Sequence, residues 1–131
     1  MLKIITPLNE LEKEAEEIQS FLDITIGEDP EEIVSRGNDL SVYLSRSGKM
    51  LADAKYHLDQ KKKSEIMGNL RSVGIKLNLP ATTLNNLINA SCENENYLVN
   101  WIDRLNRTST HQLDWCRTLI SKAKEEMKYS S

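Results

Sequence analysis

The last part of the chain has an uninterrupted helical pattern of apolar residues. After Pro80 the sequence runs for 51 residues to its end without a glycine or a proline. Apolar residues in this stretch recur every three or four positions, beginning at Leu98, Trp101 and Leu105. Because this spacing places apolar side chains on one helical face, it predicts a helix from about residue 93 to 128, roughly 50 Å long.

A second long helix is predicted between residues 30 and 61. Asp29 and Pro30 form a typical start, since aspartate caps helix N-termini and proline suits the first helical position. Spacings of four and three then alternate through Ile33, Gly37, Leu40, Leu44, Ser47, Leu51, Ala54 and Leu58. Such a seam of positions, spaced on average by 3.5 residues, keeps a helix against a straight partner. The pattern resumes in a shifted phase at Ile66. Either the helix continues through residues 58–66 with a kink, or a new helix begins at Ser64, and the shift favours the break.

Shorter elements complete the predicted organisation. An acidic N-terminal helix is expected over residues 7–22, with one apolar stripe formed by Leu8, Leu11, Ala15, Ile18 and Leu22. Residues 64–91 are expected to form a turn region with short helices. The length of 131 residues suits a single helical domain, residues 1–131.

The predicted fold class is therefore all-α, an elongated antiparallel hairpin or bundle of two long helices with shorter ones. A compact chain of this length would be only about 36 Å across. Two helices of about 50 Å exceed that diameter, so the molecule is expected to be a rod. Seam left uncovered along such a rod predicts a homo-oligomer resembling a coiled coil.

Charge is distributed unevenly along the chain, although the net charge is only −3. Residues 1–32 hold ten acidic and two basic side chains, whereas residues 33–131 hold ten acidic and fifteen basic ones. The acidic first helix is therefore expected to pack near the basic remainder, or a basic surface is kept for an anionic partner. No segment is apolar enough for a membrane span, and Cys92 and Cys116 are expected to be buried thiols. These features predict a cytoplasmic protein without a membrane partner.

Antiparallel pairing of the long helices would place Leu58 opposite Leu98 and Leu44 opposite Gln112. Polar stretches of both helices, residues 45–49 and 106–112, then meet in a polar waist. Three interpretations stay open: hydrogen bonds between Ser47, Thr108 and Gln112 that fix the register, an anion-binding crevice, or a wrong register with a solvated surface. The candidate ligand-binding residues are Arg46, Ser47, Arg104, Arg107, Thr108, His111 and Gln112.

Other candidate chemistry is sparse. Asp53 with His57 and His111 with Asp114 share helix faces, which is typical of surface ion pairs and too few ligands for a metal site. The sequence shows no recognisable nucleophile motif and no phosphate-binding glycine loop. We therefore expect a protein that is not an enzyme, with no cofactor and no metal. A basic knob that could contact nucleic acid consists of Lys61, Lys62, Lys63, Arg71 and Lys76.

Three stretches resemble small proteins of bacteriophages and of integrated elements of gut bacteria: residues 45–57, 101–107 and 110–117. The similarity extends over residues 30–128 and leads to no defined activity. It implies an accessory protein in a bacterial host cytoplasm. The functional expectation is a non-enzymatic interaction protein that binds a macromolecular partner, in the setting of phage DNA metabolism or of countering host defence. The alternatives are binding of a nucleotide or small anion at the polar waist and direct binding of nucleic acid.

Overall fold

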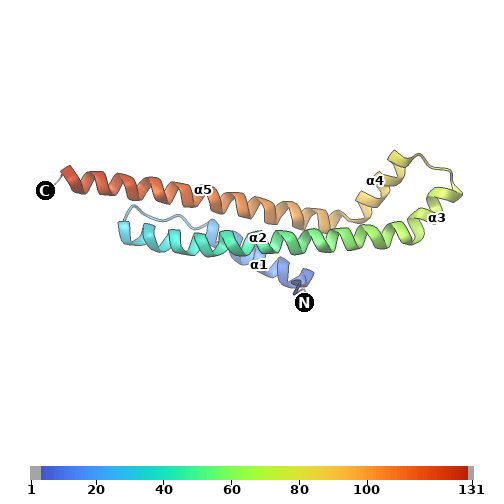
Figure 1. Cartoon of the computed structure of the whole chain (residues 1–131), viewed down its shortest axis with the longest axis horizontal. Coiled ribbons are helices and arrows are strands. Elements are labelled where there is room, and N and C mark those ends of the chain that lie inside the picture. Colours follow the sequence, from blue (N-terminus) through green and yellow to red (C-terminus); the bar gives the residue numbers. More distant parts are fainter. Residues whose placement is uncertain (1–3, 130–131) are drawn as a thin grey trace.

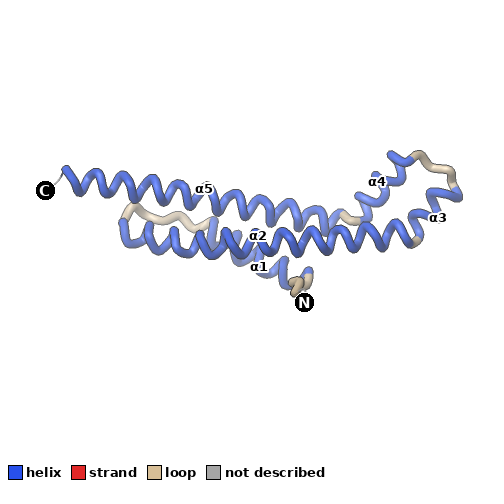
Figure 2. Tube along the Cα trace, viewed as in Figure 1, coloured by secondary structure: helices blue, strands red, loops and turns tan. Residues whose placement is uncertain are grey.

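The computed structural model describes residues 4–129, without the side chains of residues 69–71. Over this part of the chain every regular element is an α-helix (Figure 2). The helices are α1 (Leu8–Leu22), α2 (Pro30–Met67), α3 (Asn69–Lys76), α4 (Ala81–Ser91) and α5 (Glu93–Tyr129). The all-α fold class is therefore confirmed.

The two long helices α2 and α5 lie side by side in opposite directions and form a rod (Figure 1). With 38 and 37 residues, they are each about 55 Å long at 1.5 Å per residue. The short helices α3 and α4 close one end of the rod, and α1 lies against both α2 and α5. The predicted elongated hairpin of two long helices is thus present.

The predicted helix break at Ser64 is wrong. Helix α2 continues through Lys61, Lys62 and Lys63 to Met67. An ion pair between Lys61 Nζ and Glu65 Oε1, 3.4 Å apart, spans the position where the break was expected. Between Gly48 and Gly68 the sequence has no glycine or proline, so the shift in apolar phase changes which face of the helix is covered and does not end the helix.

The helix ends instead where glycine is required. A Cβ atom on Gly68 would lie only 2.9 Å from the backbone oxygen of Ser64. The chain then turns into α3, and Asn78 adopts a left-handed backbone conformation with a φ of 50° between α3 and α4. Asparagine tolerates this conformation better than most residues, so it suits the turn.

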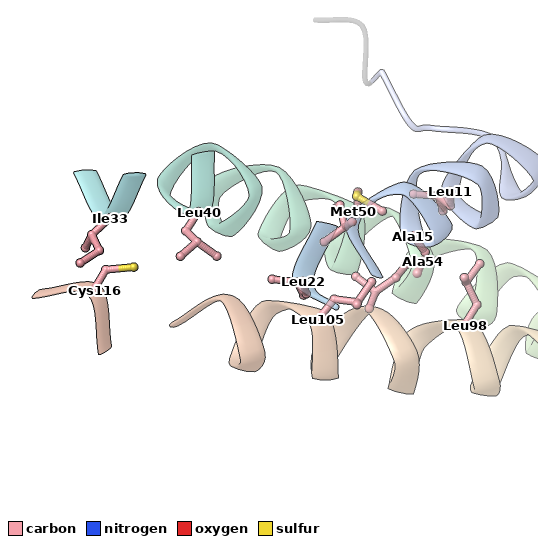
Figure 3. Close-up of a cluster of buried hydrophobic side chains, with 12 residues drawn as sticks. Leu11, Ala15, Leu22, Ile33, Leu40, Met50, Ala54, Leu98, Leu105 and Cys116 are labelled. Atoms are coloured by element: carbon pink, nitrogen blue, oxygen red, sulfur yellow. The ribbon is translucent and has the colours of Figure 1, made fainter. Parts of the chain in front are cut away.

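The core lies where α1 fills the groove between α2 and α5 (Figure 3). Its buried members are Leu11, Ala15, Ile18, Leu22, Ile33, Leu40, Met50, Ala54, Leu98, Ile102, Leu105 and Cys116. Full burial of a leucine or isoleucine contributes roughly 1.5–3 kcal/mol, so the α1 stripe is a substantial part of the stability. Helix α1 thus covers part of the apolar seam of α2 and α5, which the sequence pattern assigned to a second copy of the chain.

Charge pairing accompanies this packing. Arg46 of α2 binds Glu14 of α1 through two hydrogen bonds of 2.6 and 2.7 Å. The acidic first helix therefore does pack against a basic residue of the later chain. This hydrogen bonding raises the pKa of Arg46 above its ordinary value, against the opposing effect of burial. The guanidinium stays charged throughout the accessible pH range.

Candidate functional site

The register of α2 and α5 differs from the predicted one by about one helical turn. Asn106 donates from Nδ2 to Ser47 Oγ at 3.0 Å and to the backbone oxygen of Leu44 at 3.1 Å. Leu44 was expected to face Gln112. A slip of one turn keeps both apolar seams in phase, so the sequence pattern alone does not distinguish the two registers.

The polar waist holds register-fixing hydrogen bonds, although with partners other than the expected ones. Ser47 is fully buried and bonded to Asn106, while Gln112 bonds to Arg36 and to the backbone oxygen of Leu22. Thr108 is half-buried and takes part in neither arrangement. Paired polar groups of this kind avoid the cost of burying them unsatisfied, about 1–3 kcal/mol each.

The basic candidates of the polar waist do not form a common anion site. Arg46 is held by Glu14 and donates to Thr6 Oγ1 at 3.1 Å, on the side of α2 that faces α1. Arg104 and His111 are exposed on α5, and exposed Arg107 is hydrogen-bonded to Asp103. The surface depression beside Arg46 is lined by α2 residues alone. The predicted crevice therefore lacks the convergence that anion binding requires.

A clasp between α2 and the N-terminal segment was not anticipated. Asp53 is buried and accepts hydrogen bonds from the Thr6 backbone N–H at 3.1 Å and from Lys49 Nζ at 2.5 Å. His57 Nε2 lies 2.7 Å from the Thr6 backbone oxygen, and Lys49 also donates to the Ile4 oxygen. The expectation that Asp53 and His57 form a surface ion pair is wrong, because both bind the chain before α1.

Among the described residues, the other histidine forms no ion pair. His111 is exposed, and its expected partner Asp114 accepts a hydrogen bond from Arg117 Nη1 at 3.1 Å. Within residues 4–129, no group of three or more His, Cys, Asp and Glu side chains is arranged to hold a metal ion. Cys92 and Cys116 are both buried free thiols, as expected.

A cavity of about 230 Å³ opens where the connector after α1 passes over α2 and α5. Arg36 lines it and is only 7% exposed, with Nη2 donating to Gln112 Oε1 at 2.8 Å. Burial raises the pKa of the Cys116 thiol in this lining, and the nearby charge of Arg36 opposes that shift. The sequence could have indicated this buried arginine, because Arg36 lies one helical turn from both Ile33 and Leu40 in the apolar stripe of α2.

The end of the rod formed by residues 61–91 (Figure 1), here called the tip, has both lysines and apolar side chains exposed to solvent. Lys63 and Lys76 are exposed, whereas Lys61 and Lys62 are half-buried. The side chain of Arg71 lies outside the described residues. The basic knob thus consists, as far as the structure describes it, of four lysines on α2 and α3.

Comparison of the chain with protein-family models, with curated proteins and with solved structures found no significant match. Among the helices of the described residues, none has both the length and the hydropathy that a membrane span needs.

Proposed function

We propose that this chain is a non-enzymatic accessory protein that binds an acidic partner protein through its tip. The observation that carries the proposal is a concentration of exposed apolar side chains there. They are Ile66, Met67, Val73, Ile75, Leu77 and Leu87, with exposed fractions of 42, 77, 39, 73, 63 and 39%. Apolar side chains gathered on one surface mark interaction sites, because exposure to water costs free energy that a partner removes.

The charge of the tip favours an acidic partner. The exposed apolar residues share this end of the rod with Lys61, Lys62, Lys63 and Lys76. A partner helix with an apolar stripe and acidic flanks would satisfy both features. A second copy docked tip to tip would instead bring two sets of lysines together, which like-charge repulsion disfavours.

Nucleic acid is a weaker candidate for the same surface. Its interfaces are polar and basic, and aromatic side chains stack on unpaired bases. No aromatic residue occurs between residues 58 and 96, and isoleucine, methionine and leucine dominate the exposed side chains of the tip. The resemblance to phage and integrated-element proteins supports a bacterial host as the setting, with a host or phage protein as the partner.

Fluorescence anisotropy tests the proposal. The probe is a labelled synthetic peptide with leucines at helical spacing and glutamates elsewhere. We expect saturable binding to the wild type, weakened at least about tenfold in the double variant Ile75→Glu, Leu77→Glu. Both residues are exposed, so the substitutions leave the core intact. A peptide with lysines in place of the glutamates should bind at least about tenfold more weakly.

The matched control is the double variant Val34→Glu, Val42→Glu, which changes exposed residues on α2 away from the tip. It should bind the acidic peptide like the wild type. Absence of binding, or equal binding by the tip variant, would contradict the proposal. A short DNA duplex provides the competing arm. Tight binding of DNA with a steep salt dependence, lost in Lys63→Glu, Lys76→Glu, would assign the surface to nucleic acid instead.

A further inference from the structure

The two short helices of the tip, α3 and α4, are held to the rod by few side chains. They lie beyond the N-terminal end of α5 (Figure 1). Among the described side chains of α3 none is buried, and in α4 only Ile88 is, with 7% exposed. Helices of eight and eleven residues are not stable in water by themselves. The stability of α3 and α4 therefore depends on a small amount of buried surface.

Polar contacts add nothing to this attachment. Among the described residues, no ion pair and no side-chain hydrogen bond joins α3 or α4 to α2 or α5. Helix α1 provides the contrast, because four of its apolar side chains are at most 6% exposed. Arg46 of α2 and Trp101 of α5 also donate hydrogen bonds to α1. The short helices of the tip are therefore attached to the rod less firmly than α1 is.

Helices α3 and α4 contact each other closely. A Cβ atom on Gly74 would lie 3.1 Å from one methyl carbon of Leu84 and 3.3 Å from the other, so the α3 backbone packs directly on this α4 side chain. In the turn after α3, the Leu79 N–H donates to the backbone oxygen of Gly74 at 3.0 Å. These contacts stay intact when both helices move together. Opening is therefore expected to separate the pair from the rod and to leave α3 on α4.

We propose that α3 and α4 open from the rod as one unit in the free chain, and that docking of the acidic partner helix closes them. This inference rests on the proposed function of the tip. The exposed apolar side chains belong to both sides of the opening, Ile66 and Met67 to α2, Ile75 to α3 and Leu87 to α4. A partner helix that contacts both sides adds contacts between the unit and the rod, and so binds the closed form more tightly than the open form.

The affinity for the partner then depends on the closed fraction, because a ligand that binds one of two forms loses apparent affinity as that form becomes rarer. Ile88→Ala removes a buried side chain of α4 that is not part of the exposed surface. It should weaken binding of the acidic peptide at least about tenfold. The matched control is Ile33→Ala, which removes a buried isoleucine near the start of α2, at the opposite end of the rod (Figure 1). It should bind the peptide like the wild type.

Amide hydrogen exchange on the full chain measures opening and closing directly. In the free chain we expect amides of α3 and α4 to exchange at least about 100-fold faster than those of residues 98–109 in α5, with one common dependence on urea. The acidic peptide, with leucines at helical spacing and glutamates elsewhere, is then added at saturation. It should slow exchange in both short helices at least about tenfold and leave exchange in α1 unchanged.

Binding of the peptide without slower exchange in α3 and α4 would overturn the inference and leave the proposed function standing. Exchange in the free short helices as slow as in the centre of α5, or slowing in only one of them, would also overturn it. If the peptide does not bind, the proposed function fails together with closing by a partner, while the free chain still decides whether α3 and α4 open as one unit.

The exchange experiment needs no variant. If Ile88→Ala fails to fold, Ile88→Val compared with Ile33→Val gives the same affinity test with a smaller effect. Equal peptide affinity of the two folded variants would contradict the coupling between closing and binding.

Discussion

At the scale of single residues, Asp53 is a buried carboxyl whose hydrogen bonds outweigh the cost of burying its charge. Burial alone raises the pKa of this carboxyl, but hydrogen bonds from Lys49 and from Thr6 outweigh it, and the net pKa lies below the ordinary 3.8. A carboxyl with a lowered folded-state pKa stabilises the fold above that range and loses its contribution as the pH falls through it. Asp53 therefore ties the N-terminal segment to α2 most strongly at neutral pH.

We expect Asp53→Asn to destabilise the protein by about 1–2 kcal/mol at pH 7, because the amide keeps one acceptor but loses the ion pair with Lys49. The estimate is modest since Lys49 is half exposed. Urea unfolding between pH 7 and pH 3 measures the difference, which should shrink below about pH 4 as the wild-type carboxyl protonates. Asp59→Asn, on the exposed face of the same helix, is the control. A constant gap between wild type and Asp53→Asn across that range would contradict this account.

At the scale of the elements, the junction between α2 and α3 depends on the absence of a Cβ atom at Gly68. A Cβ at Gly68 would meet the Ser64 backbone oxygen at 2.9 Å, whereas a Cβ at Gly48 would meet Asn106 Nδ2 at an ordinary 3.8 Å. Gly68→Ala must therefore shift the backbone, because the obstructing atom is not the end of a flexible side chain. Gly48→Ala only replaces a glycine within a helix by alanine, which typically raises the free energy of unfolding by roughly 0.5–1 kcal/mol.

Amide hydrogen exchange distinguishes these two glycines. We expect Gly68→Ala to speed exchange in α3 and α4 about tenfold, corresponding to about 1.4 kcal/mol of local opening free energy. Gly48→Ala should leave exchange in α3 and α4 unchanged and raise the urea midpoint. If Gly68→Ala exchanged like the wild type, the close approach would not determine where α2 ends.

At the scale of the whole molecule, the sequence predicts where the helices begin and end better than how they are placed against one another. The starts at Pro30 and near residue 93 follow from proline, capping and periodicity, which act locally. The register was missed because a one-turn slip leaves the seam in phase. The clasp on Asp53 and the cavity at Arg36 depend on where α1 and its connector lie, and no local pattern encodes that placement. The lysines of the tip were therefore grouped correctly from the sequence, whereas the candidates of the polar waist were recognisable as polar but do not form one site.

Self-association of the chain stays a prediction. The arrangement of the helices indicates which two surfaces of neighbouring copies would meet. Helix α1 covers part of the seam, so the surface left for another copy includes the lysine-bearing tip. The acidic outer face of α1, with Glu12, Glu16 and Glu17 exposed, is its complement within the same chain. Contact between two different surfaces leaves a free surface on each end and produces open, concentration-dependent assembly.

Light scattering coupled to size-exclusion chromatography should therefore give a molar mass that rises above 15.0 kDa with concentration. Added salt should lower this mass, because screening weakens exposed charge pairs. Lys63→Glu should reduce association at low salt, while Lys128→Glu, which changes an exposed lysine near the opposite end of the rod, should not. A fixed dimer mass that ignores both salt and the Lys63 substitution would place the interface on a closed, apolar surface elsewhere on the rod.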